Sequence, residues 1–298
     1  MLRPESNKDA IKALVKTYTD QASQTNLFSA DFIQNKGEGQ VILLHGPPGT
    51  GKTLTAEPVA EFTRKPLVSI TAADLGHEPQ DLERNLTRFL KNAHIWNAVV
   101  LLDEADIYLQ RRSSHDLKRN SIVSIFLRLL DYFQGILFLT SNRVGQIDEA
   151  FMSRIHIALG YRPLDDDARA HIWDALFRKL QDDYRRGGAR IEYEYDAKQY
   201  VKRSDEVRTL QWNGREIRNA FQTVVALATF DAKNEGEKRG KSPDDVVPEI
   251  RESHLRQVVA MSAAFRKYMT STHEGMEDPD HAFRLGNRDD RFYQGSGD

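Results

Sequence analysis

Residues 41–53 read V-I-L-L-H-G-P-P-G-T-G-K-T, a short apolar run that leads directly into a glycine-rich loop. The run Val41–Leu44 predicts a buried strand, and the loop fits the pattern G-x-x-x-x-G-K-[ST]. Glycines let successive backbone N–H groups surround phosphate oxygens, while Lys52 contacts the β- and γ-phosphates and the Thr53 hydroxyl ligates Mg²⁺. The predicted contacts are Gly46, Pro47, Pro48, Gly49, Thr50, Gly51, Lys52, Thr53 and Leu54. The sequence thus predicts a bound nucleoside triphosphate; the alternative is a glycine-rich turn without a ligand.

The overall composition limits the kinds of partner. The chain has 298 residues, 40% of them hydrophobic, which is enough for a substantial core in one large or two ordinary domains. Its 42 lysine and arginine residues nearly balance its 44 aspartate and glutamate residues. Without a domain-wide basic field, binding to nucleic acid or to an anionic membrane is not favoured, and a role on DNA would need a local basic patch.

The absence of cysteine excludes disulfides and thiolate chemistry, and it favours an intracellular, reducing compartment such as the cytoplasm or nucleus. The nine histidines show no metal-ligand spacing. No apolar run approaches the roughly 20 residues of a membrane span, and the charged N-terminus is unlike a signal peptide. We therefore expect a soluble protein.

The first half of the chain alternates between strand and helix patterns. Further strands are predicted at Leu67–Ile70, Val99–Leu102, Ile136–Leu139 and Ile155–Leu159. Helical patterns lie near residues 80–94 and 120–133, and a helix predicted at Leu54–Phe62 contains Pro58, which would kink it. Because the strands are apolar throughout, they indicate a parallel sheet covered on both faces. We expect an N-terminal helix and linker over residues 1–36 and an α/β nucleotide-binding domain over 37–162.

The second half shows helical patterns only. Asp165 is expected to cap a helix to about Leu180, and further helices are predicted near residues 196–204, 214–231 and 249–270. The stretch 232–248 is rich in lysine, glutamate, glycine and proline, which is typical of a flexible loop. These patterns predict a helical second domain over residues 163–271 and a disordered polar tail over 272–298.

Two carboxylates follow a predicted strand about fifty positions after Lys52. Asp103 would hold Mg²⁺, and Glu104 would polarise a water molecule for in-line attack on the γ-phosphate. The alternative for Glu104 is a solvated acid at a strand end. The next strand delivers Asn142, whose amide would lie beside the attacking water. This combination favours hydrolysis over simple binding.

Arg154 lies at the end of a short predicted helix, far from Lys52 in sequence. We expect it on a subunit edge, where it would complete the site of a neighbouring copy. An arginine of this kind can contribute about a thousandfold in rate or more. The alternative is a surface arginine that caps a helix C-terminus.

With these motifs in place, the chain resembles the AAA+ ATPases over roughly residues 27–270, and most of all large fungal AAA-type proteins. The matching segments are Walker A at Gly46–Thr53, Walker B at Leu101–Glu104, sensor 1 at Asn142, the arginine finger at Arg154 and the sensor 2 segment at Asn213–Arg218. The resemblance implies ATP with Mg²⁺, a P-loop sheet in the order 5-1-4-3-2, a helical lid and a hexameric ring. It also implies a sensor 2 arginine at Arg215 or Arg218, of which Arg215 is favoured because it follows the glycine.

One segment departs from the family pattern. Residues 73–79 lack the aromatic residue of a pore loop that threads polypeptide. The basic run Gln110–His115 lies where ring ATPases place a second pore loop or trans-acting residues, and the alternative is a solvated loop.

The main functional prediction is an ATP hydrolase that remodels a protein or complex. The alternatives are an ATP-gated binding module with little hydrolysis and an engine acting on nucleic acid.

Overall fold

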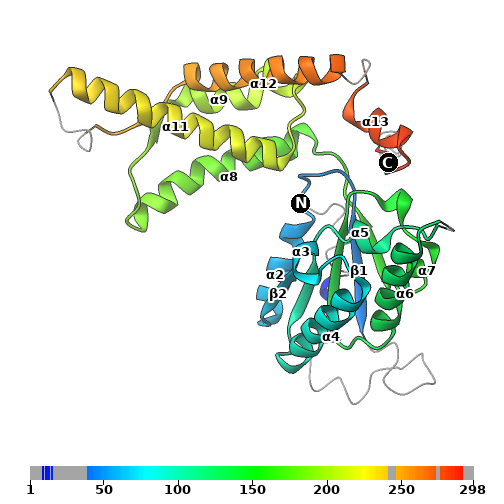
Figure 1. Ribbon diagram of the computed structural model, residues 1–298. Helices are drawn as coiled ribbons and strands as arrows, with labels where there is room; N and C mark the ends of the chain where they lie inside the picture. The colour runs from blue at the N-terminus through cyan, green and yellow to red at the C-terminus, as the bar shows by residue number, and fades with distance from the viewer. Residues whose placement is uncertain are drawn as a thin grey trace. The chain divides into compact units, whose positions relative to one another are not determined.

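The computed structural model describes residues 9, 11–13, 15, 39–113, 115–240, 246–272 and 276–290. It divides into two compact units, Met1–Arg162 with Ala282–Asp298 and Pro163–His281 (Figure 1). Each unit has its own hydrophobic core. The predicted N-terminal helix falls mostly outside the described residues, although residues 11–13 and 15 are helical.

A five-stranded parallel sheet forms the centre of the first unit. Its strands are β1 (Gln40–His45), β2 (Leu67–Ile70), β3 (Val99–Leu102), β4 (Ile136–Ser141) and β5 (Ile157–Gly160). They lie in the order β2-β3-β4-β1-β5, which confirms the predicted order 5-1-4-3-2 read from the other edge. Since all strands run the same way, the residues that follow β1, β3 and β4 meet at one edge of the sheet, where open α/β sheets bind ligands.

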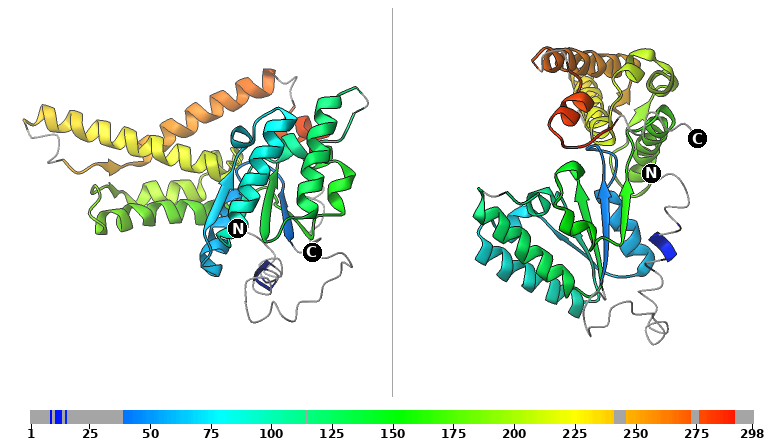
Figure 2. Two further views of the ribbon diagram at one scale, coloured as in Figure 1. Left: turned by 60° about the horizontal axis from the view of Figure 1, so that its bottom comes forward. Right: turned by 90° about the vertical axis from the view of Figure 1, so that its right-hand side faces the viewer.

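Both faces of this sheet are buried, as the continuous apolar strands predict. On one face Val41, Leu43, Val100 and Leu139 belong to the same core as Leu86 of α4 (Pro79–Ile95). On the other face Ile42, Leu44, Leu101 and Phe138 pack with Ala56 and Ala60 of α2 (Ala56–Thr63) and with Ile11 and Val15. Figure 2 shows α2 on one side of the sheet and α4 and α6 (Leu117–Asp131) on the other. The helices of this unit are η2 (Thr53–Thr55), α2 (Ala56–Thr63), α3 (Ala72–Leu75), α4 (Pro79–Ile95), α5 (Asp106–Leu109), α6 (Leu117–Asp131), η3 (Val144–Gln146) and α7 (Glu149–Met152).

The position of Pro58 corrects one expectation. A short 3₁₀ turn, η2, follows the loop, and the α-helix α2 begins only at Ala56. Pro58 is therefore the third residue of α2, in the first turn, where backbone N–H groups have no partner within the helix. Proline is tolerated at such a position, because its missing N–H would have had no partner within the helix.

Strand β5 begins two residues later than predicted because His156 takes over the pairing with β1. The His156 N–H donates to the carbonyl of Val41, and the Val41 N–H donates to His156 Nδ1 at 3.1 Å. The ring nitrogen thus replaces a backbone acceptor. Burial lowers the pKa of His156, and burial together with the Lys52 charge lowers the pKa of His45 at the end of β1.

These two histidines predict a pH dependence of stability. Their pKa values in the folded chain lie below the ordinary 6.5, so the unfolded chain binds more protons just below that pH. The contribution of the two histidines to stability should be fully present above pH 6.5, and the free energy of unfolding should fall as the pH drops below that value. Urea unfolding on both sides of pH 6.5 measures this slope. In His156→Gln, whose amide oxygen can accept from Val41 without titrating, the slope should be smaller; an unchanged slope would contradict the assignment to His156.

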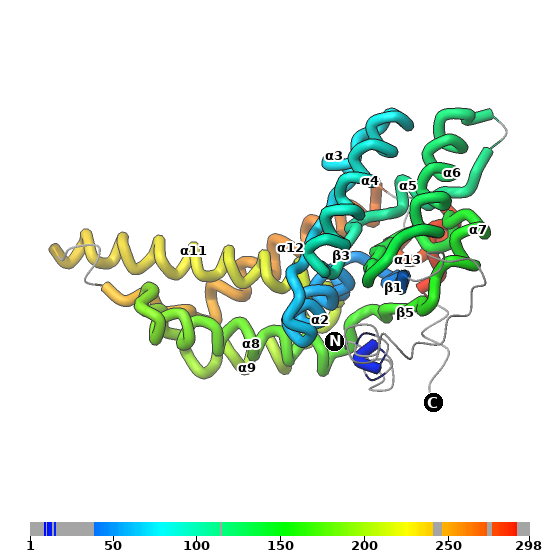
Figure 3. Tube along the Cα trace, turned by 90° about the horizontal axis from the view of Figure 1, so that it is seen from below, coloured from blue at the N-terminus to red at the C-terminus, as the bar shows by residue number. Residues whose placement is uncertain are grey.

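The described part of the second unit has a large aromatic core and is dominated by three long helices, α8 (Asp166–Arg185), α11 (Gly214–Lys238) and α12 (Glu252–Thr272). Between α8 and α11 in sequence lie α9 (Tyr195–Arg203) and α10 (Asp205–Thr209). Helix α11 packs against α8 and α12, as Figure 3 shows. Trp173, Phe177 and Phe221 are buried at their centre in edge-to-face contacts. Asp165 caps α8 as predicted, through its side chain and the N–H of Ala168.

Three expectations for the C-terminal half are wrong in part. Strands β6 (Glu192–Tyr193) and β7 (Glu249–Ile250) pair in parallel, so this unit is not helical throughout. Helix α11 continues to Lys238, into the predicted loop 232–248, with the buried Ala232 and Gly236 on one face; residues 241–245 lie outside the described part. The predicted disordered tail contains α13 (Asp278–Arg284).

Part of this tail packs on the first unit beside η3. The N–H of Gly145 donates to the carbonyl of Asn287 at 2.9 Å, and Gln146 Nε2 donates to Asn287 Oδ1 at 2.7 Å. A Cβ at Gly145 would lie 2.5 Å from the carbonyl oxygen of Gly286. Glycine at position 145 therefore permits the close approach of the tail, which the composition of the tail alone does not show.

Candidate nucleotide site

The glycine-rich loop leaves the carboxyl end of β1. Gly46, Gly49 and Gly51 have φ values of 135°, 70° and 95°, which favour glycine. At Gly46 a Cβ would also lie 2.3 Å from the carbonyl oxygen of Tyr161. Lys52 is buried, and its Nζ donates to the carbonyls of Gly46 at 2.9 Å and Pro47 at 2.7 Å. The loop is thus folded around its own lysine ammonium, a ready counter-charge for phosphate.

A hydroxyl and a carboxylate lie together beside this loop. Thr53 Oγ1 donates to Asp103 Oδ1 at 2.9 Å, across fifty residues of sequence. Both are hard oxygen ligands of the kind that Mg²⁺ prefers. The residues therefore fit the metal site predicted from Thr53 and Asp103.

Glu104 and Asn142 complete this edge of the sheet. Glu104 is exposed and has a φ of 52°, an uncommon conformation for a residue other than glycine. Asn142 follows β4, and its N–H donates to Asp106 Oδ2 at 3.4 Å. Within the described residues, Asn142 Oδ1 and Asp106 Oδ1 are buried without a hydrogen-bond partner. Unpaired buried oxygens are uncommon, and such an oxygen is free to accept a hydrogen bond from a water molecule or a ligand. The structure thus brings Lys52, Thr53, Asp103, Glu104 and Asn142 to one edge, as the sequence predicts.

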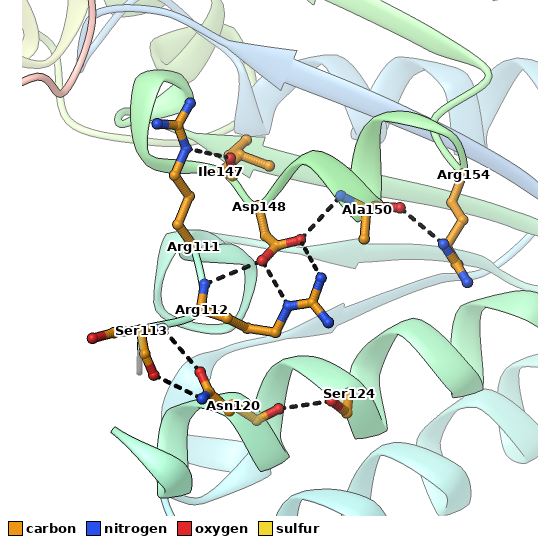
Figure 4. Close-up of polar contacts among 9 residues, drawn as sticks. All are labelled: Arg111, Arg112, Ser113, Asn120, Ser124, Ile147, Asp148, Ala150 and Arg154. Carbon is orange, nitrogen blue, oxygen red and sulfur yellow. Dashed lines mark hydrogen bonds and ion pairs between the residues drawn. The ribbon is translucent and has the colours of Figure 1, made fainter. Parts of the chain in front are cut away.

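Arg154 lies at the end of the sheet where the parallel strands begin, opposite the end that carries the phosphate loop. Its guanidinium forms a two-bond ion pair with Asp131 at the end of α6, with Nε–Oδ1 at 2.7 Å and Nη2–Oδ2 at 3.1 Å. Its Nη1 also donates to the carbonyl of Ala150 in α7 at 2.8 Å (Figure 4). Asp131 precedes β4 and Arg154 precedes β5, so both lie at the amino ends of the strands, away from the loop that follows β1. Arg154 does cap α7, which was the alternative to a finger.

The basic run after α5 is largely exposed, as expected of a solvated loop, but it is also anchored by hydrogen bonds and an ion pair. Arg112 binds Asp148 with two side-chain contacts, Nε–Oδ2 at 2.9 Å and Nη2–Oδ1 at 3.2 Å (Figure 4). The N–H groups of Arg112 and Ala150 also donate to this carboxylate, and Asp148 is the N-cap of α7. Burial alone would raise the pKa of Asp148, but these donors outweigh it and hold the pKa below its ordinary value. The run therefore ties the end of α5 to the start of α7; Ser114 lies outside the described residues.

The two sensor 2 candidates belong to the second unit. Arg215 and Arg218 lie at the start of α11, whose N-cap Asn213 forms a capping box with Glu216. The N–H of Arg215 donates to Asn213 Oδ1 at 2.9 Å. The box fixes where α11 begins and hence where both arginines lie along it.

Sequence reasoning missed Thr140, Asp148 and Asp131. Thr140 Oγ1 donates to Asp103 Oδ1 at 2.5 Å and accepts from the Glu104 N–H at 2.9 Å. A signal for Thr140 was present, because a hydroxyl near the end of β4 faces the end of β3 once the two strands pair in parallel. Asp148 and Asp131 carried no comparable local signal.

A parallel sheet with its glycine-rich loop after β1 places the chain in the class of P-loop nucleotide-binding proteins. Comparison with known families narrows this class. Residues 42–162 match the model of the ATPase family associated with various cellular activities (AAA), and residues 164–276 match that of the fungal AAA+ ATPase lid domain. The chain therefore belongs to the AAA family of ATPases.

Relatives and solved structures agree with this family. The ATPase family AAA domain-containing protein 3A homolog of Drosophila melanogaster is 27% identical over 191 residues, 61% of this chain and 32% of that protein. Spastin of Drosophila melanogaster is 30% identical over 153 residues, 46% of this chain and 20% of that protein. The matches thus span about a third or less of the length of these relatives. The AAA domain of FIGL-1 in complex with ADP has the same fold, with a TM-score of 0.63 at 19% identity over 87% of this chain and 81% of that one.

No helix in the described part of the chain combines the length and the apolar character that crossing a membrane requires.

Proposed function

We propose that this chain hydrolyses ATP in a Mg²⁺-dependent reaction and couples the cycle to remodelling of a protein or macromolecular complex. The main support for this proposal is the hydrogen bond between Thr53 and Asp103, because it joins the phosphate loop to the end of β3. The next residue, Glu104, lies in a turn and is exposed. A binding protein that does not hydrolyse ATP has less use for this second carboxylate.

Each residue has a distinct role in this proposal. Lys52 exchanges its two carbonyl partners for phosphate oxygens, while Thr53 and Asp103 hold the metal ion. Bound Mg²⁺ neutralises charge on the phosphates. Glu104 accepts a proton from the attacking water, and the unused amide oxygen of Asn142 helps to orient that water. Arg215, with Arg218 as the alternative, is the proposed sensor 2 arginine at the start of α11.

Arg154 belongs to the proposal as a residue that acts on a neighbouring copy. Within one chain it lies at the amino edge of the sheet, opposite the phosphate loop, so it suits a site in the next subunit of a ring, which we propose to be a hexamer. We also propose an intracellular location in a reducing compartment, since the chain contains no cysteine.

One observation favours a second candidate, the ATP-gated binding module. The Arg154 guanidinium is engaged by Asp131 and Ala150, so it must leave these partners before it can reach a neighbour. A chain in which this arginine stays in place would bind ATP and hydrolyse little of it. An engine on nucleic acid has less support, because the formal net charge is only −2.

The specific rate of ATP hydrolysis, measured over a range of protein concentrations, tests the proposal. We expect a Mg²⁺-dependent rate per site that rises with concentration as neighbouring subunits complete each other's sites. A flat rate would mean that one chain is sufficient or that assembly is already saturated, and the mass in solution separates these cases. Nucleotide binding without any hydrolysis would favour the gated module.

A further inference from the structure

Thr140 is a buried hydroxyl residue at the next-to-last position of β4, with 2% of its surface exposed. Strands β3 and β4 pair in register up to Leu102 and Leu139, so Thr140 lies opposite Asp103 where β3 ends. Its Oγ1 donates to Asp103 Oδ1 at 2.5 Å and accepts from the Glu104 N–H at 2.9 Å. Its carbonyl accepts from the Ala105 N–H at 2.9 Å. Thr140 therefore forms hydrogen bonds with three consecutive residues at the end of β3, namely Asp103, Glu104 and Ala105.

These contacts act on the orientation of both carboxylates. Asp103 Oδ1 accepts from both Thr140 and Thr53, and two donors converging on one oxygen leave the carboxylate little freedom to rotate. Glu104 has a φ of 52°, a backbone conformation that is unfavourable for a residue with a Cβ. Such a turn persists only where its surroundings hold it. Thr140 holds this turn in place, because its hydroxyl accepts from the Glu104 N–H and its carbonyl accepts from the Ala105 N–H.

We propose that Thr140 is a positioning residue that aims Asp103 at the metal ion and Glu104 at the attacking water. This inference rests on the proposed hydrolysis of ATP for the Glu104 part and on metal binding alone for the Asp103 part. Because Asn142 follows Thr140 by two residues, the same contacts tie the end of β4 to the end of β3. The two strand ends that carry Asp103, Glu104 and Asn142 then keep a fixed spacing.

Two substitutions at Thr140 distinguish the effect of its hydroxyl from the effect of its side-chain shape. Thr140→Val keeps the volume but removes both hydrogen bonds, whereas Thr140→Ser keeps the hydroxyl and loses only a methyl group. Residues that orient a metal ligand typically contribute 10–100-fold in affinity or activity. We therefore expect Thr140→Val to weaken metal binding and to lower kcat by about 10–100-fold, with little change in KM for ATP, while Thr140→Ser stays close to wild type.

Mn²⁺ serves as the metal probe, because its binding in the presence of ADP can be followed by electron paramagnetic resonance without any turnover. Steady-state hydrolysis is measured on the same samples. Thr63→Val is the matched control: the Thr63 hydroxyl donates to the carbonyls of Val59 and Ala60 within α2, so its loss should leave both readouts unchanged. Urea unfolding and ADP binding in EDTA show that each variant is folded. If Thr140→Val does not fold, Thr140→Ala replaces it, because it also lacks the hydroxyl and introduces no new contact.

The outcomes distinguish this inference from the proposed function. Weaker Mn²⁺ binding in Thr140→Val, restored in Thr140→Ser, supports the role of Thr140 at Asp103 even if wild type shows no hydrolysis, which would overturn the proposed function alone. A loss of kcat in Thr140→Val with rescue by serine supports its role at Glu104. Unchanged Mn²⁺ binding and unchanged kcat in Thr140→Val would overturn the inference. Equal damage in Thr140→Ser would also overturn it, since the hydroxyl would then not be the reason.

Discussion

Replacing Glu104 by glutamine is expected to lower the rate of ATP hydrolysis by about 10²–10⁴-fold, the usual contribution of a general base. The amide keeps the shape of the side chain but cannot accept the proton of the attacking water. Because Lys52, Thr53 and Asp103 are untouched, ATP should still bind. The measurement is single-turnover hydrolysis of radiolabelled ATP beside equilibrium binding of a fluorescent ATP analogue.

Glu83→Gln provides the matched control for this substitution. Glu83 is an exposed glutamate in α4, in the same unit, and pairs with Arg128 on the surface. An exposed pair of this kind contributes little to stability, so the control should hydrolyse ATP at the wild-type rate. If Glu104→Gln also hydrolysed at the wild-type rate, Glu104 would be the solvated strand-end acid of the alternative interpretation.

Replacing Arg154 by alanine is expected to lower the rate by about a thousandfold, the contribution typical of an arginine finger. The same guanidinium pairs with Asp131, so a substitution of Asp131 can distinguish a structural role of Arg154 from a role in the site of a neighbouring copy. If Arg154 only capped α7 and bound Asp131, then Asp131→Ala and Arg154→Ala should have similar, small effects. If Arg154 acts on a neighbour, Asp131→Ala should keep or raise the rate, because it releases the arginine from its partner.

Mixing two inactive variants tests whether Arg154 acts between subunits. Arg154→Ala retains an intact phosphate loop, while Lys52→Ala retains an intact Arg154. In a mixed assembly, the Arg154 of one chain can complete the site of the other, so part of the activity should return. Arg154→Lys is the conservative control, which keeps the charge but not the planar fork that matches phosphate oxygens. No recovery in the mixture, with mass measurements showing mixed assemblies, would rule out action on a neighbour.

The candidate site was predictable where its residues are close together in sequence or follow strands directly. Gly46–Thr53 form one loop, and Asp103 and Asn142 each follow a predicted strand. The partners of these residues were not predictable in the same way. Asp131 lies 23 residues before Arg154, and Arg112 lies 36 residues before Asp148. Nothing local in either segment marks such a pair.

The fold was predicted best where strands consist of continuous apolar runs. Strands β2 and β3 have the predicted bounds, whereas the two-residue strands β6 and β7 are too short to produce a pattern. The end of α11 was missed because Gly236 is typical of a loop. In the structure Gly236 is buried on the same face as Ala232, so its small size suits close packing there.

The sequence by itself determined the class of ligand and the family of this protein. The reason is physical: a phosphate loop needs glycine, lysine and threonine at set positions in one short segment, and that requirement is visible without any tertiary contact. Only the tertiary structure decided how Thr140 holds Asp103 and Glu104, and which carboxylate engages Arg154. These contacts depend on the parallel register of β3 with β4 and on where α6 ends, which bring together side chains that are 37 and 23 residues apart.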